Sequence, residues 1–157
     1  MRREQHTICV IGGGFTGIAA AITCLSEIKQ TFQLVVVEAK PSVAQGVAFG
    51  AADPMHLLNV RTRDLSIRAG QPGDFLNWAF RQLDQGENHA DLHDGLAHTF
   101  LPRQLFGEYA RQRFFEALKA AAMSRIASST RRRNPTLRRG RVFASTLPME
   151  PISTPTQ

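Results

Sequence analysis

The sequence of 157 residues predicts an α/β fold that begins with a strand-helix-strand unit. Two observations carry this prediction. Residues 7–22, TICVIGGGFTGIAAAI, form a short β-branched run that breaks at three glycines and continues as an alanine-rich helix. A second β-rich run, FQLVVVE at residues 32–38, follows that helix. We therefore expect residues 8–11 and 33–38 to be neighbouring parallel strands joined through the helix.

The loop after the first strand carries glycines at the spacing GxGxxG, and each has a separate use. Gly12 permits the tight turn out of the strand, Gly14 lets the backbone approach a pyrophosphate, and Gly17 lets the helix pack on the strand. Free N–H groups at the helix start then face the anion. Small residues at this spacing also occur wherever a helix packs tightly on a sheet, so the motif alone is weak evidence.

The second strand ends on an acidic residue, Glu38, roughly 20 positions after Gly17. In a parallel sheet this carboxylate lies beside the glycine loop, where it can accept hydrogen bonds from the hydroxyls of an adenosine ribose. Taken alone, Glu38 is more typical of a solvated strand end. Together with the loop and the order of the elements, it predicts a dinucleotide site.

After the second strand, the sequence predicts an irregular segment and then helices. Residues 40–74 contain turn formers at short intervals and predict a long segment that faces the ligand. Asp74 then caps a helix that ends near Leu83, and residues 103–122 have helical periodicity. The positions expected on the core faces of these helices are Phe75, Trp78, Ala79, Leu83, Leu105, Tyr109, Phe114 and Leu118.

A polar segment separates the two helices. Residues 84–100 hold the histidines His89, His93 and His98. Gly86 and Gly95 argue against a helix there, and no cysteine or second ligand pair completes a metal site. We expect a polar loop with solvated histidines and no metal. Cys9 and Cys24 are expected to be small buried side chains in a reduced, cytoplasmic protein without a targeting signal or membrane span.

The net charge of +6 resides at the carboxyl end of the chain. Residues 121–157 contain seven arginines, no lysine and a single acidic residue, set among Ser, Thr and Pro. This composition predicts a basic, disordered tail. We divide the chain into an incomplete α/β domain at residues 1–120 and the tail at residues 121–157.

Four segments together resemble a known family: VIGGGFTGIAAAI, GVAFGAADPMHLLNV, DFLNWAF and FLPRQLFGEYARQRF. Over residues 7–118 the chain resembles the amino-terminal part of FAD/NAD(P)-binding proteins related to flavin-dependent N-hydroxylating monooxygenases. The resemblance implies a Rossmann-like FAD-binding βαβ unit. In the full-length family NAD(P)H reduces FAD, and the reduced flavin activates oxygen or passes electrons on.

The resemblance also implies the cofactor-binding residues. These are Gly12, Gly14 and Gly17 for the FAD pyrophosphate, Glu38 for the ribose, Asn59 beside the flavin and Arg103 outside the loop. A turn-stabilising amide and a surface charge at a helix start are equal alternatives for Asn59 and Arg103. Where the family continues LNV with Pro-Ala and a Met, this chain has Arg61, Thr62 and Leu65. The fit near the flavin ring is left open, and no catalytic residue is assigned.

The resemblance predicts further strands, a nicotinamide domain and a substrate pocket that the sequence lacks. We therefore expect a truncated front part of an FAD-dependent oxidoreductase, inactive alone, with a frame-shifted tail that begins near Ala122. A frame one base earlier forces a glycine at the codons of Met149 and Glu150, which is compatible with family sequence. The alternatives are an NAD(P)-binding module and a basic-tailed nucleic-acid-binding protein, although no recognition helix or interleaved aromatics accompany the arginines. The oligomeric state is left open.

Overall fold

The computed structural model describes residues 6–40, 43–50, 53, 55–83, 89–130 and 143–146, and the structural statements below concern these residues. The elements, in chain order, are β1 (His6–Ile11), α1 (Phe15–Glu27), β2 (Phe32–Glu38), α2 (Gly46–Phe49), the 3-10 helix η1 (Thr62–Asp64), α3 (Asp74–Leu83), α4 (His89–Ala97), α5 (Arg103–Thr130) and β3 (Phe143–Thr146).

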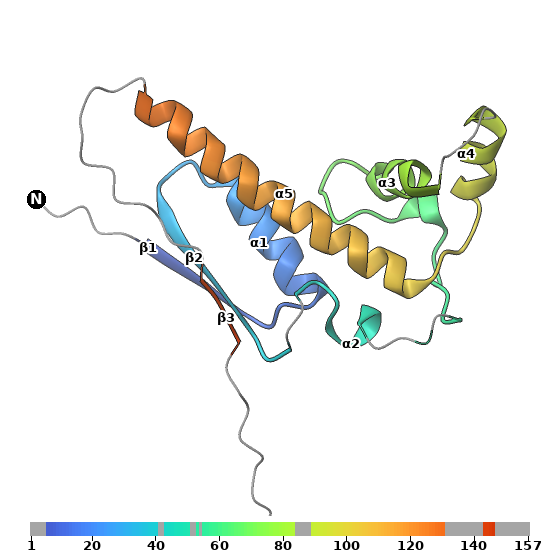
Figure 1. The fold of residues 1–157 in the computed structure, drawn as a ribbon, viewed down its shortest axis with the longest axis horizontal. Coiled ribbons are helices and arrows are strands. Elements are labelled where there is room, and N and C mark those ends of the chain that lie inside the picture. Colours follow the sequence, from blue (N-terminus) through green and yellow to red (C-terminus); the bar gives the residue numbers. More distant parts are fainter. Residues whose placement is uncertain are drawn as a thin grey trace, which may run out of the picture.

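The strand-helix-strand prediction is confirmed. β1 and β2 pair in parallel, with Ile8 opposite Leu34 and Ile11 opposite Val37. β3 pairs in parallel with the other edge of β2, so the strand order is β1-β2-β3 and β2 is central (Figure 1). The α/β fold class with a Rossmann-like βαβ unit therefore holds.

α1 lies on one face of the sheet, and α5 packs along α1 (Figure 1). Alternate side chains of β2 are buried on this side because successive residues of a strand point to opposite faces. The buried residues of this layer are Ile18, Ala21 and Ile22 of α1, Phe32, Leu34 and Val36 of β2, and Phe106, Tyr109, Ala110 and Phe114 of α5.

The helix predicted from Asp74 to Leu83 is present as α3, and it packs against the first half of α5. Phe75 is fully buried, with its ring centroid 4.9 Å from that of Phe106 and 5.0 Å from that of Tyr109. Leu83, expected in the core, is instead 51% exposed because it is the last residue of the helix.

The predicted polar loop is wrong for residues 89–97, which form α4. Leu96 and Ala97 are buried, and the ring of His93 packs edge-on against Phe80. Nε2 of His93 also lies 3.3 Å from Oδ1 of Asn77. Packing against α3 thus offsets the low helix propensity of Gly95, and His93 is not a freely solvated side chain.

Two expectations near the chain's carboxyl end are also wrong. The helical pattern was expected to end near Ala122, but α5 continues to Thr130 and crosses the proposed boundary at residue 120. Residues 143–146 form β3, where no ordered element was expected; aromatic and β-branched residues suit a strand. The rest of the predicted tail lies outside the described residues.

Neither cysteine is fully buried. Cys9 is exposed and Cys24 is half-buried, and both are free thiols. Ile8 and Val10 pack against the core, so Cys9, between them in β1, points to the opposite face of the sheet. Within the described part of the chain, no helix has the length and apolar character needed to cross a membrane.

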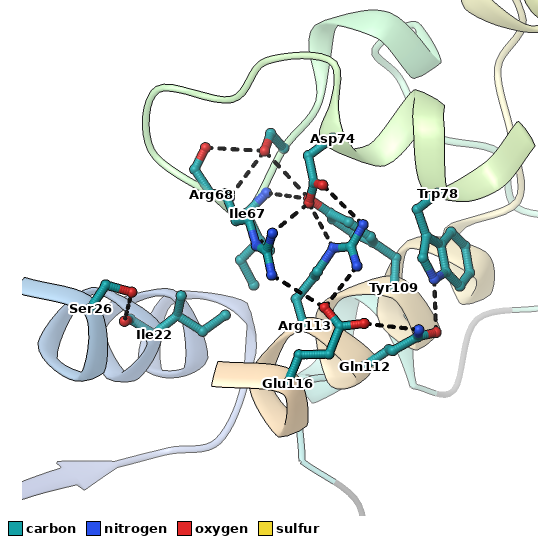
Figure 2. A network of polar contacts seen from close by, with 11 residues as sticks. Ile22, Ser26, Ile67, Arg68, Asp74, Trp78, Tyr109, Gln112, Arg113 and Glu116 are labelled. Carbon is teal, nitrogen blue, oxygen red and sulfur yellow. Dashed lines mark hydrogen bonds and ion pairs between the residues drawn. The ribbon is translucent and has the colours of Figure 1, made fainter. Parts of the chain in front are cut away.

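A partly buried polar network joins α3 to α5 (Figure 2). Arg113 donates two hydrogen bonds to Asp74, from Nε to Oδ2 at 2.7 Å and from Nη2 to Oδ1 at 2.9 Å. The Tyr109 hydroxyl donates to Oδ2 of the same carboxylate at 2.8 Å. Glu116 accepts from Arg113 at 2.8 Å and from Arg68 at 3.2 Å. The network thus attaches two parts of the chain to α5: the start of α3, through Asp74, and the segment before α3, through Arg68.

Protonation states in the network follow from these contacts. Burial disfavours the charge on Arg113, but its hydrogen bonds to Asp74 and Glu116 outweigh this effect and raise its pKa. Burial likewise opposes the charge of Glu116, yet hydrogen bonds from Arg113 and Gln112 lower its pKa. Burial raises the pKa of Tyr109. The network is therefore charged at neutral pH, with a protonated tyrosine.

Replacing Asp74 with alanine should lower the free energy of unfolding by about 3 kcal/mol, because it leaves the Arg113 guanidinium buried without its main partner. The matched control is Asp64→Ala, whose pair with Arg63 is about half exposed. That change should stay within about 0.5 kcal/mol. Urea unfolding followed by circular dichroism measures both, and equal effects would contradict the role given to the network.

Candidate functional site

The candidate site lies at the carboxyl end of the sheet. The ends of β1 and β2, the first turns of α1 and α5, and α2 lie toward the same end of the molecule (Figure 1). The glycine loop follows β1 directly, and the Gly12 N–H donates to the Val37 carbonyl at 2.8 Å. This bond continues the parallel ladder by one residue and holds the start of the loop beside β2.

The three predicted glycines, Gly12, Gly14 and Gly17, differ in the physical reason for having no side chain. Gly12 has φ +93°, a conformation that side chains disfavour, although a Cβ there would meet nothing within 4 Å. At Gly17 a Cβ would lie 2.0 Å from the Gly12 carbonyl oxygen and 3.0 Å from Cγ1 of Val10, so packing itself requires glycine. A Cβ at Gly14 would be in ordinary contact, 3.6 Å from Cα of Gly46.

The start of α1 is open to an acceptor. Gly14 is its N-cap residue, no side chain caps the helix, and no acidic residue lies in the first turn. The first backbone N–H groups of a helix have no partner within the helix, and the helix dipole adds partial positive charge there. This arrangement suits an anion such as a phosphate.

Glu38 lies beside the loop, as the sequence predicts. Its Oε2 accepts the Gly13 N–H at 2.6 Å, and its Oε1 accepts the Lys40 N–H at 2.9 Å. The Lys40 N–H has the largest effect on this carboxyl, and with the Gly13 N–H it outweighs burial and lowers the pKa of Glu38. Glu38 is therefore an anion that orders the glycine loop.

The segment around α2 forms a second wall of the loop. The Ala44 N–H donates to the Gly13 carbonyl at 2.6 Å, and Ala44 is fully buried with φ +72°. The rings of Phe15, Phe49 and Phe106 then pack together, with centroid distances of 5.2–6.1 Å. Sequence reasoning missed these contacts; the third consecutive glycine and the GVAF segment were the available signals.

Arg103 and Asn59 occupy the neighbouring loop. The Arg103 Nε donates to the Leu57 carbonyl at 3.0 Å, and its backbone N–H donates to the His56 carbonyl at 2.9 Å. Leu57 forms a bridge with Pro102, and Asn59 is exposed two residues further on. The structure thus brings Arg103 to the segment that carries Asn59, and the hydrogen bonds described for Arg103 are to this segment.

Exposed apolar side chains occur at the end of β1, on α2 and in the segment after α2. Ile11, at the end of β1, is 86% exposed, Val47 of α2 is 89% exposed and Met55 is 83% exposed. Ile11 is adjacent to Gly12 in the chain, and Val47 to Gly46. The described residues hold no cluster of three or more His, Cys, Asp and Glu side chains suited to a metal ion.

Residues 9–137 match the FAD-NAD(P)-binding family. The chain belongs to this family. The matched residues include the glycine loop, Glu38, Asn59 and Arg103, and they extend past Ala122. No curated protein and no solved structure matches the chain. Membership of the FAD-NAD(P)-binding family makes the chain a dinucleotide-binding module, in agreement with the cradle that the loop, the open start of α1 and Glu38 form.

The Gly13 amide should report the titration of Glu38. The pKa of Glu38 in the folded protein lies below the ordinary 4.5. The Glu38 carboxylate therefore stabilises the folded state above pH 4.5, and this stabilisation is lost as the pH falls through the lowered pKa. An NMR titration of the Gly13 amide proton should therefore show a midpoint below 4.5. Glu38→Gln should abolish the step, and a midpoint at or above 4.5 would contradict the contact.

Gly17→Ala should lower the free energy of unfolding by about 2 kcal/mol, because the added methyl group meets backbone that cannot move aside freely. Gly95→Ala is the matched control, since a Cβ at that helical glycine meets nothing within 4 Å. We expect this control to be neutral or to stabilise by up to ~1 kcal/mol. Chemical unfolding of both variants makes the comparison, and a neutral Gly17→Ala would show that α1 can shift on β1.

Proposed function

We propose that this chain is the FAD-binding front part of a flavin-dependent NAD(P)H oxidoreductase of the monooxygenase type. One observation carries the proposal: Gly12, Gly17 and the uncapped start of α1 form a phosphate cradle, with the Glu38 carboxylate directly beside it. Strand, loop, helix and acidic strand end have the order that holds a dinucleotide in a parallel sheet.

The pyrophosphate and ribose have separate partners in this proposal. The N–H groups at the start of α1 would bind the pyrophosphate, which approaches closely because Gly14 has no side chain. Glu38 would bind the adenosine ribose. A carboxylate offers about four acceptor positions, and the backbone N–H groups of Gly13, Ala39 and Lys40 take part of this capacity, so a ribose hydroxyl can still be accepted.

The choice of FAD over NAD(P) rests on the resemblance and on the surface around the loop. Ile11 and Val47, next to Gly12 and Gly46 in the chain, expose apolar side chains that a flavin ring would cover with a gain in hydrophobic free energy. Asn59 and Arg103 are the polar residues that we assign beside the cofactor. An NAD(P)-binding module remains the second candidate because it uses the same glycine loop.

Bound FAD would supply hydride and electron transfer, and the residues of this chain would hold and orient it. We assign no catalytic residue. The described residues form one dinucleotide cradle, whereas the proposed reaction also needs a nicotinamide site. We therefore propose that the chain of 157 residues has no turnover by itself and holds the adenosine diphosphate half of FAD better than the flavin half.

The basic segment takes no part in this proposal. We propose that any change of reading frame lies after residue 137, where the family match ends. The nucleotide sequence of the 3′ side tests this: a shifted frame without recognisable family sequence contradicts it. Nucleic-acid binding through the arginines is not proposed.

Titration of the purified chain tests the function. ADP should bind, and FAD should bind no more than about tenfold more tightly, because the polar contacts described here serve the adenosine diphosphate part. Gly14→Val should abolish both, since its side chain occupies the place of the phosphates. Isothermal calorimetry measures ADP, and flavin fluorescence measures FAD.

Gly95→Val provides the matched control, because that position has open space around it. It should bind ADP like the original chain. Equal binding by Gly14→Val would refute the assigned cradle. Tighter binding of NADH or NADPH than of FAD would favour the NAD(P) module, and a yellow, stoichiometric flavoprotein that oxidises NAD(P)H would show that the chain is a working enzyme.

A further inference from the structure

A buried glycine inside α5 lets α2 approach closely. Gly107 lies one turn after Arg103, where glycine is unfavourable for a helix. A Cβ at this position would lie 3.1 Å from Cβ of Phe49 and 3.3 Å from its carbonyl oxygen. It would also lie 3.5 Å from Cγ of Gln45. Glycine at position 107 therefore sets how near α2 lies to α5.

On its other side, α2 lies against the glycine loop. A Cβ on Gly46 would be 3.1 Å from Cα of Gly14, so the two backbones are nearly in contact. Just before α2, the Ala44 N–H donates to the Gly13 carbonyl. Ala44 and Gly46 both have left-handed φ values, +72° and +53°, which fold this segment tightly onto the loop.

The aromatic rings leave α2 little room to move sideways. The Phe49 ring lies 5.2 Å from that of Phe106 and 6.1 Å from that of Phe15, the first residue of α1. Gly46, at the start of the same short helix, faces Gly14 at close range, so a displacement of α2 would change the contact between Gly46 and Gly14. Close-packed groups of this kind transmit small shifts to their neighbours.

We infer that Gly107 is a positioning residue for the phosphate cradle: its missing side chain fixes, through α2, the placement of Gly13 and Gly14. The inference rests on the proposed dinucleotide function. A methyl group at position 107 should push α2 into the loop and weaken binding of the diphosphate. The adenosine partner, Glu38, belongs to β2 and should be less affected.

Gly107→Ala tests the inference, with Gly95→Ala as its matched control. Both changes add the same methyl group within a helix, but position 95 has open space. The first measurement is hydrogen exchange of the Ala44 amide relative to that of Val36 in β2. Gly107→Ala should raise this ratio by about tenfold, because the Ala44 to Gly13 bond opens locally. Gly95→Ala should leave it unchanged.

The second measurement compares ADP with adenosine by calorimetry. Gly107→Ala should reduce the advantage of ADP over adenosine by about tenfold, because the phosphates meet a misplaced loop. A merely structural role for Gly107 would lower the melting temperature and leave this advantage intact. The melting temperatures of both variants are recorded in parallel.

The outcomes distinguish failure of the inference about Gly107 from failure of the proposed function. If the unmodified chain binds ADP but Gly107→Ala changes neither the exchange ratio nor the advantage of ADP, the inference is overturned and the proposed function stands. If the unmodified chain binds neither ADP nor adenosine, the proposed function fails, and the role of Gly107 fails with it. A change in both ratios in Gly107→Ala alone supports the inference.

Discussion

The close approach of α1 to the end of β1 is the constraint on which the site depends. With glycine at position 17, the helix passes so near the Gly12 carbonyl that a single methyl group would collide with it. This approach sets where the first turn of α1 begins and which way its N–H groups point. The turn at Gly12 and the contact of Glu38 with Gly13 then fix the loop between them.

A single helix, α5, contacts both the candidate site and α3. Its first turns carry Phe106 and Gly107, which contact the site segments, and the next turns carry Tyr109 and Arg113, which hold α3. The same helix packs along α1. The polar network is therefore connected to the site through one rigid element, although it lies outside the cradle itself.

The sequence predicted those structural elements that depend on local residue patterns. The β1-α1-β2 unit, α3 and the placement of Glu38 follow from patterns within continuous stretches of the sequence. Contacts between distant segments were not predictable: α4 forms because α3 buries its last turn, and β3 forms on the edge of β2. Gly107 gave no signal, since its reason is a contact with Phe49 that the sequence pattern does not show. Site geometry beyond the loop therefore required the structure.

The parallel pairing of β3 with β2 has a consequence for folding kinetics. β2 ends at Glu38 and β3 begins at Phe143, so their pairing must close a loop of about a hundred residues, against roughly twenty for β1 and β2. The longer closure costs about 1.4 kcal/mol more in chain entropy. The βαβ unit should consequently form early, while the third strand joins late and slows the final step of folding.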